Sequence, residues 1–154
     1  MAQPAPAHRR SDAHLVLLVE DNPDHAELVK RALDDYQSTI QLRHLEDGAE
    51  ALQYLRGEGR FADPQQFPHP RLVLLDIRLP KVDGLEVLRL VKSDAGLQHI
   101  PVVMLTTSSS SRDRIRAYQN HANSYLKKPV DFAQFHEMMA SFARYWFAWN
   151  QPSG

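Results

Sequence analysis

The chain has 154 residues, the length of about one domain. It contains no cysteine, which excludes disulfides, thiol catalysis and cysteine-ligated metal sites. Its 18 Lys and Arg residues against 19 Asp and Glu residues give a net charge of −1, so no global field directs it to nucleic acid or to an anionic membrane. No apolar run approaches the roughly 18 residues of a membrane span, and the N-terminus lacks a signal-peptide core. We expect one soluble, cytoplasmic domain with no room for a second domain of ordinary size.

Residues 1–13 are rich in Pro, Ala and Arg and lack apolar periodicity, which indicates a disordered arm. After the arm, short apolar runs alternate with helical patterns. Four of the runs are compact, as in strands buried on both faces, and cover residues 15–19, 72–75, 102–105 and 124–126. Residues 40–45 alternate between apolar and polar, as a strand exposed on one side does.

The intervening segments have helical periodicity. The expected helices follow the Asn22-Pro23 cap, cover residues 49–55, 85–91 and 112–120, and run from a cap at Asp131 to about residue 150. Strands that alternate with helices predict a parallel sheet with helices on both of its faces. Residues 57–70 read as an irregular loop, unusually long for a compact domain.

Chemically active side chains follow four of the predicted strands. Glu20 and Asp21 end the first, Asp76 the third, Thr106 the fourth and Lys128 the fifth. Ligands of open parallel sheets bind beyond the carboxyl ends of the strands, so these groups should share one rim. A surface cap explains any one of them, but it is a weak explanation for all four strand ends together.

This group of side chains favours phosphoryl transfer. Three carboxylates at close range repel one another unless a cation lies among them, and hard oxygen ligands suit Mg²⁺. A lysine and a hydroxyl add donors for an anion that also touches the metal. Asp76, on the middle strand, is the expected nucleophile, forming an acyl phosphate, and Lys128 would pair with a phosphoryl oxygen.

These residues resemble the receiver domain of two-component response regulators. The resemblance covers about residues 14–148 and rests on separated motifs, which are Glu20-Asp21, residues 76–80 with Asp83-Gly84, Thr106, and residues 125–129. The spacings are also typical of receivers, with 30 residues from Asp76 to Thr106 and 22 from Thr106 to Lys128.

The resemblance implies a fold, a cofactor and a partner. The fold would be flavodoxin-like, with five parallel strands in the order 2-1-3-4-5, over residues 14–150, followed by a tail at 151–154. Asp76 would accept a phosphoryl group from a partner histidine kinase. Mg²⁺ would be held by Glu20, Asp21, Asp76 and the backbone carbonyl of Arg78.

The resemblance also implies a conformational switch. Thr106 would move toward the phosphoryl group while Tyr125 rotates inward. Lys128-Pro129 would carry the cis peptide bond usual in the family, which an X–Pro bond accommodates at low cost.

Three features depart from the family pattern. The acidic pair begins with Glu20 rather than Asp, which lengthens one arm and keeps the charge. Lys127 stands beside Lys128, and only Lys128, directly before the proline, matches the motif. Arg78 and Ser108 occupy positions that tune phosphate lifetime in receivers, so we expect the Arg78 guanidinium to screen or engage the phosphoryl group.

Within the family, the chain is similar to the stand-alone regulators paired with bacterial phytochromes. The similarity rests on residues 20–23, the long 57–70 insertion and the tryptophans near the C-terminus. It implies a phytochrome-type histidine kinase as the partner.

The last predicted helix carries more apolar side chains than one face of a sheet usually buries. A stripe at helical spacing consists of Phe132, Phe135, Met139, Phe142, Trp146 and Trp149. Phe147 should project about 140° from the centre of this stripe at 100° per residue. Core packing accounts for part of the stripe, and we expect the remainder to form a homodimer interface comprising Phe132, Met138, Phe142, Tyr145, Trp146, Phe147 and Trp149.

The eight histidines show no ligand pairing on a predicted helix, so we expect surface positions for them. The favoured interpretation is a single-domain response regulator that signals by contact, without turnover of small molecules. One alternative is a Mg²⁺-dependent phosphohydrolase, but those enzymes usually place a second acid two residues after the nucleophile, where this chain has Arg78. The other is a receiver-like interaction module that works without phosphorylation.

Overall fold

The computed structural model describes residues 13–152, so the expected arm, apart from residue 13, and the last two residues of the tail lie outside the described part. Five parallel strands form one sheet in the order β2-β1-β3-β4-β5, which confirms the expected fold. The strands are β1 (His14–Val19), β2 (Ile40–Leu45), β3 (Leu72–Leu75), β4 (Val102–Thr106) and β5 (Ser124–Lys127).

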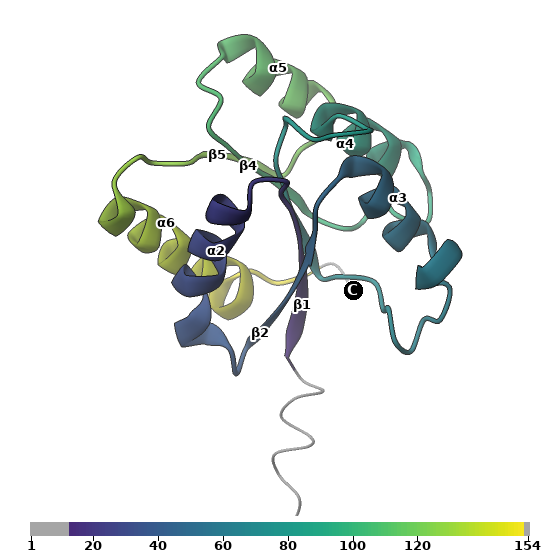
Figure 1. Cartoon of the computed structure of the whole chain (residues 1–154), viewed down its shortest axis with the longest axis horizontal. Coiled ribbons are helices and arrows are strands. Elements are labelled where there is room, and N and C mark those ends of the chain that lie inside the picture. Colours follow the sequence, from purple (N-terminus) through teal and green to yellow (C-terminus); the bar gives the residue numbers. More distant parts are fainter. Residues whose placement is uncertain (1–12, 153–154) are drawn as a thin grey trace, which may run out of the picture.

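Helices connect the strands and cover both faces of the sheet (Figure 1). The α-helices are α2 (Pro23–Ala32), α3 (Gly48–Arg56), α4 (Gly84–Ser93), α5 (Ser111–Gln119) and α6 (Phe132–Arg144). Three shorter helical segments are η1 (Asp34–Tyr36), η2 (Gly59–Phe61) and η3 (Tyr145–Trp149). Within residues 13–152, none of these helices is long and apolar enough to cross a membrane.

The sheet separates two hydrophobic cores. Helices α2 and α6 pack on one face, and α3, α4 and α5 on the other (Figure 1). Successive side chains of a strand point to opposite faces, so Val16 and Leu18 enter the core under α2 and α6 while Leu17 and Val19 enter the other. A strand buried on both faces has no room for polar side chains before its end, which explains the compact apolar runs.

One strand expectation is wrong. The run at residues 124–126 is not buried on both faces, because β5 is an edge strand and its first three residues are only half-buried. Each face of β5 still contributes to a core, through Tyr125 on one side and Leu126 on the other. The alternating run at residues 40–45 forms β2, at the opposite border of the sheet. Gln41 is exposed but Arg43 is half-buried and Leu45 is buried, so the expected exposure of one side is only partial.

A polar cap begins each α-helix within the described residues. In each case a side-chain oxygen accepts a hydrogen bond from a backbone N–H of the first turn, and the caps are Asn22, Asp47, Asp83, Ser110 and Asp131. Because the helices follow parallel strands, their first turns lie at the carboxyl rim of the sheet. The caps therefore fix the loops that surround the rim groups.

The last helix changes its geometry before it ends. After Arg144 the chain continues as the π-helix η3, in which Asn150 N–H donates to the Tyr145 carbonyl at 2.7 Å. The wider turn rotates the side chains that follow, so Phe147 stacks on His14 with ring centroids 5.2 Å apart. The prediction that Phe147 projects away from the core is therefore wrong. Phe142 is buried in the core, so it is not available for the predicted homodimer interface.

The 57–70 insertion is better ordered than an irregular loop. It contains η2, and Phe61 is buried against Tyr54 and Phe67 at centroid distances of 5.1 Å from each. Arg43 lies over the rings of Tyr54 and Phe67 and donates to the Gln66 carbonyl at 3.1 Å. These contacts attach the insertion to β2 and α3, on the side of the molecule that also carries α4.

Candidate functional site

Three carboxylates converge at the carboxyl rim of the sheet. Glu20 and Asp21 follow β1, Asp76 follows the adjacent β3, and one oxygen of each lies within 4.8 Å of the others. Glu20 and Asp76 are buried, whereas Asp21 is exposed. The site is therefore open to solvent on one side and closed on the other.

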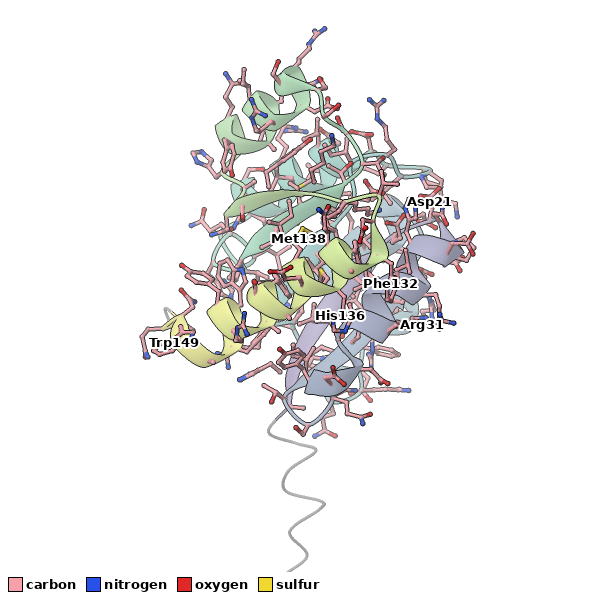
Figure 2. All side chains as sticks on the ribbon, turned by 90° about the vertical axis from the view of Figure 1, so that its left-hand side faces the viewer. Asp21, Arg31, Phe132, His136, Met138 and Trp149 are labelled. Atoms are coloured by element: carbon pink, nitrogen blue, oxygen red, sulfur yellow. The ribbon has the colours of Figure 1, made fainter. Side chains whose placement is uncertain are left out.

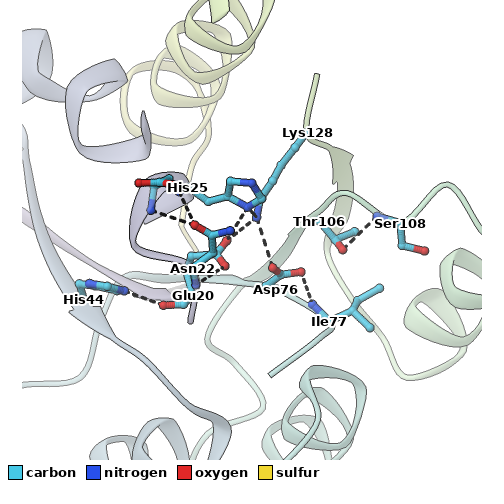
Figure 3. A network of polar contacts seen from close by, with 10 residues as sticks. Glu20, Asn22, His25, His44, Asp76, Ile77, Thr106, Ser108 and Lys128 are labelled. Carbon is cyan, nitrogen blue, oxygen red and sulfur yellow. Dashed lines mark hydrogen bonds and ion pairs between the residues drawn. The ribbon is translucent and has the colours of Figure 1, made fainter. Parts of the chain in front are cut away.

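Lys128 supplies the positive charge that this cluster requires. Its buried ammonium forms ion pairs with Asp76 and Glu20 (Figure 3). It donates one hydrogen bond to Asp76 Oδ2 at 3.2 Å and a second, short one to Glu20 Oε1. Lys127 is exposed, so the lysine directly before the proline is the one in the site. The Lys128-Pro129 bond is trans, which corrects the cis expectation, and trans is the form that an X–Pro bond favours intrinsically.

Burial changes the acidity of Glu20. Loss of solvent raises the pKa of Glu20 to about 7, the hydrogen bond from Lys128 opposes this change, and the negative charge of Asp76 adds to it. A buried carboxylate with such a pKa holds its proton easily unless more positive charge enters the site. A cation bound beside Glu20 would therefore stabilise its ionised form.

The donor atoms fit Mg²⁺. This ion prefers hard oxygen ligands, uses one or two protein carboxylates and retains waters, which suits a cluster with one exposed and two buried carboxylates. No histidine or cysteine is among the three groups. The chain thus offers the ligand chemistry of magnesium, and the Arg78 carbonyl stays a predicted fourth ligand.

Two backbone contacts fix Asp76. Its Oδ1 accepts from the Ile77 N–H at 2.7 Å, which leaves Oδ2 directed at Lys128. Gly84 packs so closely that a Cβ atom there would lie 1.9 Å from the Asp76 carbonyl oxygen. The Asp83-Gly84 motif therefore has a steric reason, because only glycine permits this approach of α4 to the end of β3.

Thr106 and Tyr125 meet at one loop residue. Thr106 ends β4, is fully buried, and accepts at Oγ1 from the Ser108 N–H at 3.2 Å. Tyr125, on β5, donates from its hydroxyl to the Ser108 carbonyl, also at 3.2 Å. The two expected switch residues are thus connected through the backbone of Ser108.

The same loop residue reaches the helix that follows. Ser108 Oγ donates to Asp113 Oδ2 at 2.7 Å, and Arg78 Nη2 lies 3.5 Å from that oxygen. The Arg78 side chain is 75% exposed and is held toward α5 by this contact. Asp113 was not expected in the site, and no sequence signal identified it, because the contact depends on how α5 lies against the β3–α4 loop.

Two half-buried histidines also lie beside the cluster, and the expectation that the histidines are surface residues rather than ligands did not indicate these contacts. His44 Nε2 donates to the Glu20 carbonyl at 2.7 Å, and His25 Nδ1 lies 3.0 Å from Lys128 Nζ (Figure 3). Burial, followed by the charge of Lys128, lowers the pKa of the His25 imidazole. One sequence signal was available for His25: it follows Pro23 by two residues and so falls in the first turn at the rim.

The side chains of the expected dimer interface are divided between core and surface. Phe132, Tyr145 and Trp149 are 50, 55 and 76% exposed, whereas Met138 and Trp146 are half-buried against the core. Figure 2 shows Phe132 and Trp149 at opposite ends of the last helical stretch. A cavity of about 830 Å³ adjoins Tyr145 at the amino ends of β3, β4 and β5. The carboxylate cluster lies at the other, carboxyl end of the strands.

Comparison with known proteins agrees with this arrangement. The chain is 47% identical over 146 residues to the probable methanogenesis regulatory protein FilR2 of Methanothrix harundinacea, covering 93% of this chain and 90% of that protein. It is 37% identical over 132 residues to the response regulator Rcp1 of Synechocystis, covering 86% and 88% of the two chains. The structure is similar to that of the phosphorylated cyanobacterial phytochrome response regulator RcpA, with a TM-score of 0.87 and 35% identity over 92% of this chain and 99% of that one.

A second solved structure is the Mn²⁺-bound form of Rcp1, with a TM-score of 0.84 and 35% identity over 92% and 99% of the two chains. The family model of the response regulator receiver domain matches residues 16–140, which include every residue of the carboxylate and lysine cluster. The chain therefore belongs to the response regulator receiver family, and its relatives include stand-alone phytochrome response regulators.

Proposed function

We propose that this protein is a stand-alone response regulator that accepts a phosphoryl group on Asp76 from a histidine kinase, with Mg²⁺ as the cofactor. The observation that carries the proposal is the position of Asp76 Oδ2. It lies 3.2 Å from the Lys128 ammonium, in a carboxylate cluster whose oxygens approach within 4.8 Å. A nucleophile, a cation site and a fixed ammonium are the parts that phosphoryl transfer requires.

The chemical step is an in-line displacement at phosphorus. An oxygen of the Asp76 carboxylate forms the new P–O bond, and the P–N bond of the kinase phosphohistidine breaks. The electron pair goes to the ring nitrogen, and a ring protonated on its other nitrogen leaves as neutral imidazole. Bound Mg²⁺ supplies positive charge against the phosphoryl oxygens. Lys128 pairs with one of these oxygens, and Ile77 N–H holds Asp76 Oδ1 during the attack.

The response to phosphorylation passes through the β4–α5 loop. A phosphoryl group on Asp76 adds negative charge and acceptor oxygens beside the Thr106 hydroxyl. When Thr106 turns toward that group, the Ser108 N–H loses its acceptor, and the contact between Ser108 and Tyr125 changes with it. The result is a population shift in the surface formed by this loop, α5 and β5.

The proposed partners are a histidine kinase of the phytochrome type and a second copy of the chain. The solved relative RcpA is a cyanobacterial phytochrome response regulator, which supports the kinase assignment. The dimer contact is formed by the exposed Phe132, Tyr145 and Trp149 of the last helical stretch. Turnover of small phosphate esters is not part of the function, because Arg78 stands where a phosphohydrolase needs an acid.

Phosphorylation of Asp76→Asn tests the proposal. The variant should lose labelling by a radiolabelled small phosphodonor in Mg²⁺, because an amide is not a nucleophile for phosphorus. Asp35→Asn is the matched control, since Asp35 is 78% exposed and lies outside the cluster. Undiminished labelling of Asp76→Asn refutes the assignment. If the affinity for a partner is the same with and without phosphorylation, the result supports the alternative of an interaction module.

A further inference from the structure

His25 contacts Lys128 but is not part of the chemistry described above. It lies in the first turn of α2, and its side chain is 33% exposed. Its Nδ1 lies 3.0 Å from Lys128 Nζ and 3.9 Å from Glu20 Oε1. The ring is therefore at the rim of the site, with one nitrogen directed inward (Figure 3).

The chemistry of the two groups determines the direction of this hydrogen bond. A lysine ammonium has three N–H donors and no acceptor, so Nδ1 must be the acceptor and the ring proton must be on Nε2. The three acceptors of Lys128 are Glu20 Oε1, Asp76 Oδ2 and His25 Nδ1, which equal its three donors. Any phosphoryl oxygen that binds Lys128 therefore has to displace one of these acceptors.

The three acceptors differ in what the proposed function asks of them. Glu20 is an expected metal ligand and Asp76 is the proposed nucleophile, so during the reaction their oxygens bind the metal ion or attack phosphorus. The imidazole of His25 has no other role in the reaction. Of the three acceptors of Lys128, the lone pair on His25 Nδ1 is therefore the one that stays available throughout the reaction.

We propose that His25 is a positioning residue that holds the Lys128 ammonium over the phosphoryl group while Glu20 and Asp76 are engaged. This inference rests on the proposed function and adds a residue to it. His25 acts through Lys128 and does not itself receive phosphate.

The first turn of α2 is built to hold this histidine still. Asn22 Oδ1 accepts from the Asp24 N–H at 2.9 Å and the His25 N–H at 3.2 Å, and Pro23 opens the helix. The Asn22 N–H in turn donates to Glu20 Oε2 at 3.1 Å. One turn of backbone therefore orients both His25 and Glu20 toward Lys128, while the next residue, Ala26, is fully buried and anchors the helix.

The test compares His25→Ala with His25→Asn. Alanine removes the acceptor, whereas the asparagine Oδ1 lies at nearly the same distance along the side chain as Nδ1 and accepts a hydrogen bond. The rate of phosphorylation by acetyl phosphate at saturating Mg²⁺ should fall about tenfold in His25→Ala, the size expected for one hydrogen bond to a charged group. His25→Asn should recover the rate to within about threefold, and Mg²⁺ affinity by calorimetry should be unchanged in both variants.

His136→Ala is the matched control, because His136 is on α6 and pairs with exposed Asp35. Two results would overturn the proposal: a His25→Ala rate equal to that of the unaltered protein, or an asparagine variant as slow as the alanine one. Nitrogen NMR of the unaltered protein gives an independent answer that needs no variant to fold. The proton should be on Nε2, and a proton on Nδ1 at neutral pH contradicts the hydrogen bond.

These outcomes are separable from failure of the proposed function. If the unaltered protein takes no label from acetyl phosphate in Mg²⁺, phosphorylation of Asp76 is refuted and the role of His25 falls with it. If the unaltered protein is labelled and His25→Ala is labelled at the same rate, only the role of His25 is refuted.

Discussion

The hydroxyl of Tyr125 donates a hydrogen bond to the backbone carbonyl of Ser108 at 3.2 Å. The N–H of the same Ser108 donates to the Thr106 hydroxyl. A residue on an edge strand and a residue at the centre of the site therefore hold one loop residue from both sides. This arrangement gives the expected switch pair a physical connection that does not require the two side chains to touch.

Tyr125→Phe should loosen the β4–α5 loop. Loss of the hydroxyl leaves the Ser108 carbonyl without this donor and should cost about 0.5–1.5 kcal/mol of stability. Amide hydrogen exchange in residues 107–110 should become faster, while exchange in the core strands follows only the global change. Tyr118→Phe is the control, because its side chain is 49% exposed on α5. Equal exchange in the loop of both variants would contradict the connection.

Gly84→Ala should destabilise the fold near Asp76, the proposed phosphorylation site. The added Cβ would lie 1.9 Å from the Asp76 carbonyl oxygen, so backbone must move, at a cost of about 1–3 kcal/mol or more. Urea unfolding measures the loss. In the control Gly96→Ala the nearest atom is 3.4 Å away, at a side-chain oxygen of Asp94, so little change is expected. A Gly84→Ala protein as stable as the control would disprove the steric argument.

Mg²⁺ should raise the melting temperature. An ion that binds the folded carboxylate cluster and not the unfolded chain adds about 1.4 kcal/mol at ten times its Kd, or a few degrees. Asp21→Asn should reduce this rise, because it removes the exposed carboxylate of the cluster, while Asp35→Asn should leave it intact. An equal rise in Asp21→Asn would assign the effect to ions bound elsewhere.

Stability without metal should depend on pH through Glu20. Burial raises the pKa of Glu20 in the folded state from 4.5 to about 7, so between these values the folded protein holds a proton that the unfolded chain has lost. The free energy of unfolding therefore contains a Glu20 contribution that falls as pH rises from 4.5 to 7. Urea denaturation in EDTA measures the free energy of unfolding at each pH. As pH rises from 4.5 to 7, this free energy should fall more steeply in the unaltered protein than in Glu20→Gln. The same pH dependence in both proteins would contradict the raised pKa.

The protein should dimerise through the last helical stretch. The exposed Phe132, Tyr145 and Trp149 present large apolar area, and their burial against a second copy is favourable. Light scattering at micromolar concentrations, with and without a phosphoryl mimic, should give a mass that rises with concentration. Trp149→Ala should lower that mass, while Tyr118→Ala, an exposed aromatic on α5, should not. A monomeric mass at all concentrations would refute the interface.

The sequence was sufficient to predict the sheet and the residues that end its strands. The runs at residues 15–19, 72–75 and 102–105 coincide with β1, β3 and β4 to within one residue. Such runs are informative because a strand buried on both faces excludes polar side chains until its end. Parallel strands then bring the groups that follow them to one rim, so Asp76 and Lys128 are neighbours although 52 residues separate them.

Packing between segments that are distant in the sequence decided the features that the sequence did not predict. The edge position of β5 leaves residues 124–126 half-buried, and the π-helix turns Phe147 inward onto His14. His25 and Lys128 are 103 residues apart and belong to different elements, so no local pattern indicates their hydrogen bond. Local patterns record which face of an element is apolar and what ends it. The partner that a polar side chain meets depends on how two elements lie against each other, and only the tertiary structure determines that.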